Sequence, residues 1–498
     1  MMLWFLLMVP TLAGLVCFVQ RSSSHCRIIL CAVAFLHCMF VLVCWVQAPI
    51  SLTSDWLGLD DTGLVFLTMV SLLFMATSVY TFGYLKSEDT GSRKDLEENI
   101  WFRNSKDSVF TGCMLLFLAT MTLVTVSRHL GLMWVAIEAT TLSSAPLIYY
   151  HRHHRSLEAV WKYLLICSVG IALAMLGNFF MIVAGAGVGP HGVHLSLKDL
   201  TFHAPELNPV WLKAAFVLCL VGYGTKMGLA PMHNWLPDAH SEAPSSVSAL
   251  LSGALLNCAF LVLFRIHIIM TAAGQGATSS FLFTLLGVAS IVVAAVFIVG
   301  QTDYKRMLAY SSVEHMGIIA LGIGVGGVGV VGSLFHVINH SLVKGMLFMT
   351  AGNIMAAFKS KRVADVRGLL KVRPVTAVLL VTGAFAILGT PPFGTFFSEF
   401  TILKGMVDSH RYILAVVYLL SLGVIFVAFS AKIVFMVFSR SPFGKDQDMG
   451  AATGLGQPEP VWSTAPLMVL GALALGLGLY TPVWLLRVLY GITYLGGS

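Results

Sequence analysis

The chain has 498 residues, of which 57% are hydrophobic and only 11% are charged, and its net charge is +7. Soluble domains carry about 25% charged residues, so this composition excludes an ordinary soluble protein and predicts that much apolar surface faces lipid. In a membrane protein a basic excess usually sits on cytoplasmic loops, so it gives no reason to expect a nucleic-acid partner.

Apolar segments close to the ~20 residues that cross a bilayer recur along the whole chain. The first, from Met1 to Val19, lacks a basic leading region and a clear cleavage site, so we expect a retained helix and not a signal peptide. The predicted spans are 2–20, 28–47, 63–85, 108–127, 129–150, 158–186, 210–232, 244–268, 279–301, 306–326, 328–357, 374–403, 412–439 and 462–489. The sequence therefore predicts an all-α, polytopic membrane bundle of about fourteen helices.

Basic residues alternate between the loops that join these spans. The odd-numbered loops hold 19 Lys and Arg residues and the even-numbered loops hold 4. By the positive-inside rule the odd loops are cytoplasmic, which places both termini on the non-cytoplasmic side of the membrane.

The nine cysteines offer no CxxC pair, and most lie inside apolar runs. Iron–sulfur and zinc sites need clustered thiolates, so we expect no metal, no cofactor and no catalytic residue in this chain. Gly322 to Gly327 match GxGxxG, but a dinucleotide site needs a preceding strand, and close helix packing is the better interpretation here.

Charged residues inside membrane spans are costly, so each is a functional candidate. Glu138 lies near the middle of the fifth predicted span, and Lys226 lies just before Gly228 and Pro231, which break the seventh. Close together, each would favour the other's charged form, so an arriving proton could reset the pair. A static buried ion pair between two helices is the alternative.

Two further groups lie near the predicted cytoplasmic side. Lys162 lies at the start of the sixth span, with Glu158 one turn before it. The two residues form either a surface ion pair or part of a proton uptake route. His233, Asp238, His240 and Glu242 cluster between spans seven and eight. Such clusters can bind metals, but we favour a proton-collecting mouth or a helix cap.

The second half of the chain repeats this pattern of buried charge beside a broken helix. His336, His340 and Lys344 are spaced i, i+4, i+8, which places them on one helix face about 6 Å apart along the axis, as a proton relay requires. Glu314 lies inside the tenth span, and Glu399 follows a break at 389–393 in the twelfth. Paired broken helices indicate an internal repeat around a transport site, and two ordinary proline kinks are the alternative.

The long motifs at 134–144, 224–244 and 308–314 resemble the antiporter-like subunits shared by respiratory complex I, Mrp-type antiporters and membrane-bound hydrogenases. The likeness covers nearly the whole chain and is greatest to component F of hydrogenase-4. It implies that Glu138 and Lys226 are the family's carboxylate–lysine pair, that His336, His340 and Lys344 form the relay, and that Glu399 is the terminal charged residue. Many complex I relatives have a lysine where this chain has Asn257, which could hold water without storing a proton.

The resemblance also implies an organisation and a role. We expect N-terminal helices in 1–107, two inverted five-helix repeats in 108–268 and 279–440 with helices 7 and 12 broken, and a last helix in 441–498. The expected function is proton translocation as a non-catalytic subunit of a redox-driven complex, with other membrane subunits and a peripheral redox arm as partners. An Mrp-type Na⁺/H⁺ antiporter module and a non-pumping scaffold are the alternatives.

Overall fold

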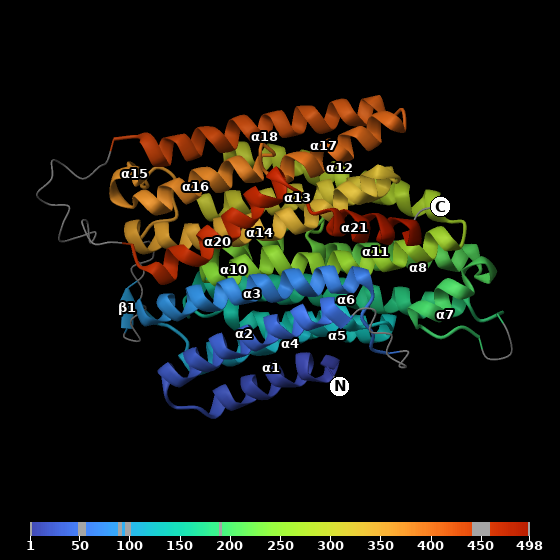
Figure 1. Cartoon of the computed structure of the whole chain (residues 1–498), viewed down its shortest axis with the longest axis horizontal. Helices are drawn as coiled ribbons and strands as arrows, with labels where there is room; N and C mark the ends of the chain where they lie inside the picture. The colour runs from blue at the N-terminus through green and yellow to red at the C-terminus, as the bar shows by residue number, and fades with distance from the viewer. Residues whose placement is uncertain are drawn as a thin grey trace, which may run out of the picture.

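The computed structural model describes residues 2–47, 56–87, 92–94, 101–188, 192–440 and 459–496. They form a bundle of long, roughly parallel helices (Figure 1). The helices are α1 (Met2–Val19), α2 (Ser23–Gln47), α3 (Asp61–Ser87), α4 (Asp107–Val126), α5 (Leu130–Ile148), α6 (His154–Ala184), α7 (Leu197–Phe202), α8 (Pro209–Met227), α9 (Trp235–Glu242), α10 (Ser245–Leu250), α11 (Leu256–Ala272), α12 (Gly276–Gly300), α13 (Tyr304–Val325), α14 (Val328–Phe358), α15 (Leu369–Val372), α16 (Pro374–Ile387), α17 (Gly394–Asp408), α18 (Tyr412–Phe438), α20 (Val461–Leu479) and α21 (Val483–Gly496).

Within the described residues, thirteen helical stretches are long and apolar enough to cross a membrane. One of them is continuous through α10, a π-helical turn η2 (Leu251–Leu255) and α11. The broken pair α16–α17 supplies the fourteenth crossing, so the predicted membrane bundle of about fourteen helices is confirmed.

Both predicted helix breaks are present. The chain leaves α8 at Gly228, whose φ of 80° is a left-handed conformation that favours glycine, and resumes as α9. It leaves α16 before Gly389, which has a φ of 61°, and resumes as α17 after two prolines. Each break falls in the fourth helix of a predicted set of five, which agrees with two related halves.

Three local features differ from the sequence predictions. The last predicted helix is two helices, α20 and α21, because Pro482 follows a non-helical Tyr480 and cannot continue the first. The loop at 86–107 contains a small antiparallel pair, β1 (Ser92–Lys94) and β2 (Trp101–Arg103). A short helix α7 and a 3₁₀ turn η1 (Ala204–Glu206) precede α8.

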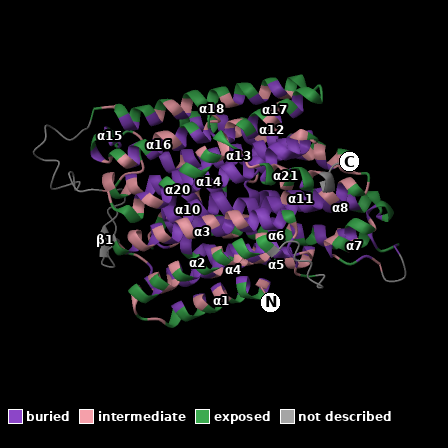
Figure 2. Ribbon diagram, viewed as in Figure 1, coloured by how far each residue is buried: buried purple, intermediate pink, exposed green. Residues whose placement is uncertain are grey.

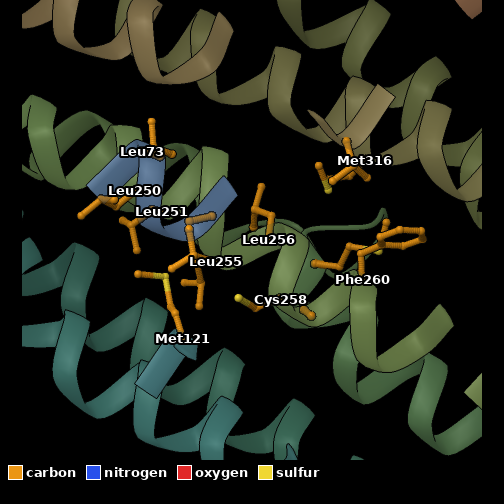
Figure 3. Packing of buried hydrophobic residues seen from close by; sticks show 14 of the residues in the cluster. Leu73, Met121, Leu250, Leu251, Leu255, Leu256, Cys258, Phe260 and Met316 are labelled. Atoms are coloured by element: carbon orange, nitrogen blue, oxygen red, sulfur yellow. The ribbon is translucent and has the colours of Figure 1, made fainter. Parts of the chain in front are cut away.

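The core lies around the middle of the chain. Every residue in the most apolar stretch of α10–η2–α11 is buried, and 94% are buried in that of α13, against 28% in α18. Figure 2 shows this gradient, from the buried centre to the largely exposed outer helices. Around η2 the packing is aliphatic: Leu73 and Met121 approach Leu250, Leu251 and Leu255 from neighbouring helices (Figure 3).

The ends of the bundle differ in sequence character. The loops that carry β1 and α15, both rich in Lys and Arg, lie at one end, and both chain termini lie at the other (Figure 1). This arrangement agrees with the alternation of loop charge. Glycine 324 confirms the packing interpretation of the GxGxxG match, because a Cβ there would collide with Thr284 and the Ser280 carbonyl of α12.

Candidate functional site

Lys226 occupies the last turn of α8 and is completely buried. Its Nζ donates hydrogen bonds to Thr141 Oγ1 of α5 at 2.8 Å and to the Tyr163 hydroxyl of α6 at 2.6 Å. The same ammonium lies 4.4 Å from the centre of the Tyr163 ring. Three helices therefore converge on one buried cation, which is held by hydroxyl groups and a ring face.

Glu138 reaches the lysine through Thr141. The Thr141 hydroxyl lies 3.3 Å from Glu138 Oε2, and Ser168 donates to Glu138 Oε1 at 3.2 Å. The carboxylate is not within ion-pair distance of Lys226, and Glu138 is half-buried beside exposed Val135 and Leu142. The predicted pair of Glu138 and Lys226 is thus connected through the Thr141 hydroxyl. This link holds the two helices together less tightly than a direct ion pair would.

The second buried lysine, Lys344, lies on α14 against α13. Its Nζ donates to the Leu308 carbonyl at 2.9 Å and to the Ser311 hydroxyl. Glu314, also on α13 and 3% exposed, lies within electrostatic range of the ammonium. Lys344 and Glu314 are therefore neighbours in the core, although the sequence places them on different helices.

The histidine row is assembled from two helices. His336 Nδ1 lies 2.8 Å from the Ser398 hydroxyl, and His336 Nε2 lies 2.8 Å from Nδ1 of His315 on α13. The His315 ring is also 5.5 Å from that of His340. Both ring nitrogens of His340 are buried without a hydrogen-bond partner among the described residues, whereas the ring of His315 also lies near the Ile387 backbone. Buried nitrogens usually form hydrogen bonds to protein groups or to water, so those of this row are available to bind water or to accept a proton.

Glu399 closes the row at the break between α16 and α17. One carboxylate oxygen lies within 4.8 Å of ring nitrogens of His315 and His336, and a Cβ at Gly389 would overlap the carboxylate. Two imidazoles and a carboxylate can also bind metals. Here the imidazoles already hydrogen-bond to each other, and the second nitrogen of His336 is used by Ser398, so the donors favour proton exchange.

His240 and His233 do not form one cluster with their acidic neighbours. The His240 ring stacks on Phe348 at 4.7 Å, with both nitrogens unpartnered and Lys344 within electrostatic range. His233 packs near Phe297 and Tyr310, 6.5 and 6.1 Å between ring centres. His240 therefore extends the row of open imidazoles toward the end with basic loops, whereas His233 lies apart from it.

The acidic members of that segment are paired with cations on other helices or, for Glu242, in the loop that follows α14. Asp238 binds Lys162 of α6 at 2.9 Å and Arg306 of α13 at 2.8 Å, and Glu242 binds Lys361 at 2.8 Å. Lys162 also binds Glu158 at 2.7 Å, and its side chain is 45% exposed. These contacts correspond to the surface-bridge alternative for Lys162. Through Asp238 they also connect α9 to both α6 and α13.

Asn257 secures the π-helical turn. Its Nδ2 donates at 2.8 Å to the Gly253 carbonyl and at 2.8 Å to the Ser341 hydroxyl of α14. Its Oδ1 is buried without a partner. Single π-helical turns within α-helices often occur at functional sites. The Asn257 amide oxygen is free to bind water, which fits the role expected for this residue.

A family model described as NADH:quinone oxidoreductase/Mrp antiporter, transmembrane, matches residues 127–425, which include both buried lysines and the histidine row. The chain belongs to this family. The resemblance inferred from the motifs is thereby confirmed, and the chain is an antiporter-like membrane subunit.

This chain matches different fractions of individual family members. The Hydrogenase-4 component F homolog of Methylacidiphilum infernorum (isolate V4) is 37% identical over 347 residues, 69% of this chain and 71% of that protein. The Na⁺/H⁺ antiporter subunit A1 of Staphylococcus haemolyticus (strain JCSC1435) is 30% identical over 421 residues, 78% of this chain but only 48% of that protein. A chain of an archaeal membrane-bound sulfane sulfur reductase shares the fold, with a TM-score of 0.86, 21% identity and 99% and 97% coverage.

The sequence analysis did not identify several residues of the site in this chain. His315 follows Glu314 directly and could have been recognised as a second titratable group in the same buried motif. Thr141, Tyr163 and Ser398 give no comparable signal, because hydroxyl residues are common in membrane helices and only helix packing brings these three to a charge.

Proposed function

We propose that this chain is the proton-translocating membrane subunit of a redox-driven complex of the hydrogenase-4 or complex I type. The observation that carries the proposal is the buried row of His240, Lys344, His340, the His315–His336 pair and Glu399. Members of this row present unpartnered nitrogens to the core. A scaffold would gain nothing from placing a row of ionisable side chains in the core, since burying each of them is costly.

Proton movement along the row needs no covalent chemistry. A proton given to His340 would pass through bridging water to His315, whose Nδ1 contacts His336 Nε2. His336 would release a proton from Nδ1 toward Ser398 and Glu399 as it accepts one at Nε2, because an imidazole can donate from one nitrogen while accepting at the other. The protonated carboxyl of Glu399 would then lie beside the helix break at Gly389, from which the far side would be reached.

The Lys226–Thr141–Glu138 link supplies a control element for this row. A change of charge on the half-exposed Glu138 face would alter the field at the buried ammonium of Lys226 through one hydroxyl. Adjacent membrane subunits are the expected source of such a change, because the exposed apolar residues around Glu138 offer them a contact surface.

The remaining parts of the proposal concern sides and partners. The end with basic loops would face the cytoplasm and both termini the opposite side. Electrons would be handled by a peripheral redox arm, since all nine cysteines here are free and not clustered as a metal centre among the described residues. Reporter fusions in the loop 359–368 and at the C-terminus test the sidedness, and metal analysis of the pure subunit tests the absence of cofactors.

A Na⁺/H⁺ antiporter module is the second candidate, favoured by the likeness to the staphylococcal antiporter subunit. The two are separated by proton uptake into inverted vesicles that contain the whole complex. Redox substrate should drive uptake without Na⁺, Lys344→Ala should abolish it, and the exposed control Lys404→Ala should leave it unchanged. Uptake that requires a Na⁺ gradient, or normal uptake by an assembled Lys344→Ala complex, would contradict the proposal.

A further inference from the structure

A cavity of about 470 Å³ lies outside the proton row, at the bundle end that carries the basic loops. It is a half-open hollow between the ends of α3, α14, α16 and α20. Its lining includes two cations, Lys86 and Arg373, together with Tyr84, Trp462 and Glu459. The volume is far above the ~10–15 Å³ that one water needs, so the hollow has room for a polar headgroup and not only for solvent.

The charge available in this cavity is positive. Neither Lys86 nor Arg373 forms an ion pair or a side-chain hydrogen bond with any other described residue, although Arg373 is half-buried. The carboxylate of Glu459 is already used: it accepts from the backbone amides of Val375 and Thr376 and from the Thr376 hydroxyl, at the N-terminus of α16. An anion would therefore meet the exposed Lys86 and the half-buried Arg373, two cations without a carboxylate partner among the described residues, and one carboxylate whose charge is compensated.

The cavity also lies at a membrane boundary. Lys86 ends the apolar span Asp61–Lys86, Trp462 is the second residue of the span Val461–Leu479, and Arg373 directly precedes Pro374 of α16. Tyr and Trp concentrate at this depth. Beside the cavity, α20 exposes Val461 (71%), Trp462 and Val469, an apolar strip along which acyl chains can lie.

We propose that this cavity binds the phosphate of an anionic phospholipid, with Arg373 and Lys86 as its two cationic ligands. Basic pockets between membrane helices on the cytoplasmic side are suited to such headgroups. A free phosphate ester shares the headgroup chemistry, but it would not use the exposed apolar strip of α20. The lipid would tie α3 and α20 to α14, which carries the histidine row, and to α16, which leads to the break before Glu399.

The test is a titration of delipidated, detergent-solubilised complex with phosphatidylglycerol, followed by native mass spectrometry of bound lipid and by thermal unfolding. Saturable binding should weaken about fivefold for Arg373→Gln and for Lys86→Gln, as expected for one cation each near a membrane surface. Arg373→Lys, which keeps the charge, should retain most of the affinity. Lys371→Gln is the matched control, because Lys371 is exposed at the same end and does not line the cavity.

Two results would overturn the proposal. One is equal affinity of the wild-type chain and the Lys86→Gln/Arg373→Gln double variant, with both correctly folded by circular dichroism. The other is equal binding of phosphatidylethanolamine or of water-soluble glycerophosphoglycerol, which would show that the site selects neither anionic charge nor a membrane lipid. If the Gln variants unfold, the Arg373→Lys variant and the two competitor ligands still decide the question.

Discussion

The two buried lysines of this molecule occupy contrasting surroundings. Lys226 is held by hydroxyl groups that lead outward to the half-buried Glu138, whereas Lys344 belongs to a wholly buried row that continues through His340, His315 and His336. In the proposed mechanism the first set senses charge at the side of the bundle, and the second passes protons along its length. The proposal therefore assigns different roles to the two buried lysines.

The helix breaks sharpen the contrast. In the first half the charged residue precedes the break, with Lys226 two residues before Gly228. In the second half it follows the break, and the Glu399 carboxylate lies against Gly389. Lys226 therefore belongs to a continuous helix, α8, up to its last turn. In the proposed mechanism Glu399 instead exchanges its proton at the point where the α16–α17 backbone is interrupted.

Outside the buried row that contains Lys344, the largest effect is expected from Lys226→Ala. It removes the only cation that the Thr141 and Tyr163 hydroxyls contact among the described residues, so Glu138 loses its link to the core. Coupled proton uptake should fall at least about tenfold, equivalent to roughly 1.4 kcal/mol or more in barrier height. Vesicle assays on the assembled complex measure this, and normal uptake with normal subunit content would show that the residue is structural only.

Glu138→Gln should give a comparable loss, because it disables the other end of the same link. The double variant Lys226→Ala/Glu138→Gln should then be no worse than either single variant, as expected for coupled groups. Additive losses in the same assay would show that the two residues act independently.

Within the second half, His336→Ala should slow uptake more than His340→Ala. His336 bridges His315 and Ser398 by direct contacts, whereas the nitrogens of His340 have no protein partner and water can replace them. Equal effects would indicate that no water spans the gap. His37 is a matched control: it is equally buried, but its two nitrogens are satisfied by Ser71 and Thr122 far from the row.

Thr141→Val should produce a smaller defect than any loss of charge. The substitution keeps the shape and removes the hydroxyl between Lys226 and Glu138, so coupling weakens while both charges remain. Thr140→Val is the control, since the Thr140 hydroxyl bonds only to the Ile137 carbonyl of its own helix. Identical proton uptake by both variants would argue against the hydroxyl bridge.

The sequence predicted those features whose signals are local. Apolar length defines spans, Gly228 and Pro231 break a helix by their own backbone restrictions, and a charge within a span stands out wherever it occurs. The partners of the charges could not be predicted, because Thr141, Tyr163 and Ser398 become important only through the packing of α5, α6 and α17. The four residues expected to cluster within 233–242 do not come together for the same reason, because Arg306 of α13 and Lys361 of the loop after α14 bind the two carboxylates.

The smallest effect is expected from Lys162→Gln, which contrasts an exposed lysine of the first half with the buried Lys226. Lys162 is 45% exposed and bridges Glu158 and Asp238, and Asp238 keeps a second partner in Arg306. Exposed ion pairs contribute about 0–1 kcal/mol, and salt screens them, so the free energy of unfolding should change by no more than this. Proton uptake should stay at the wild-type rate in the vesicle assay. A loss of uptake as large as that of Lys226→Ala would instead place Lys162 on the uptake route, and it would mean that protons reach the core along α6 and not only past His240.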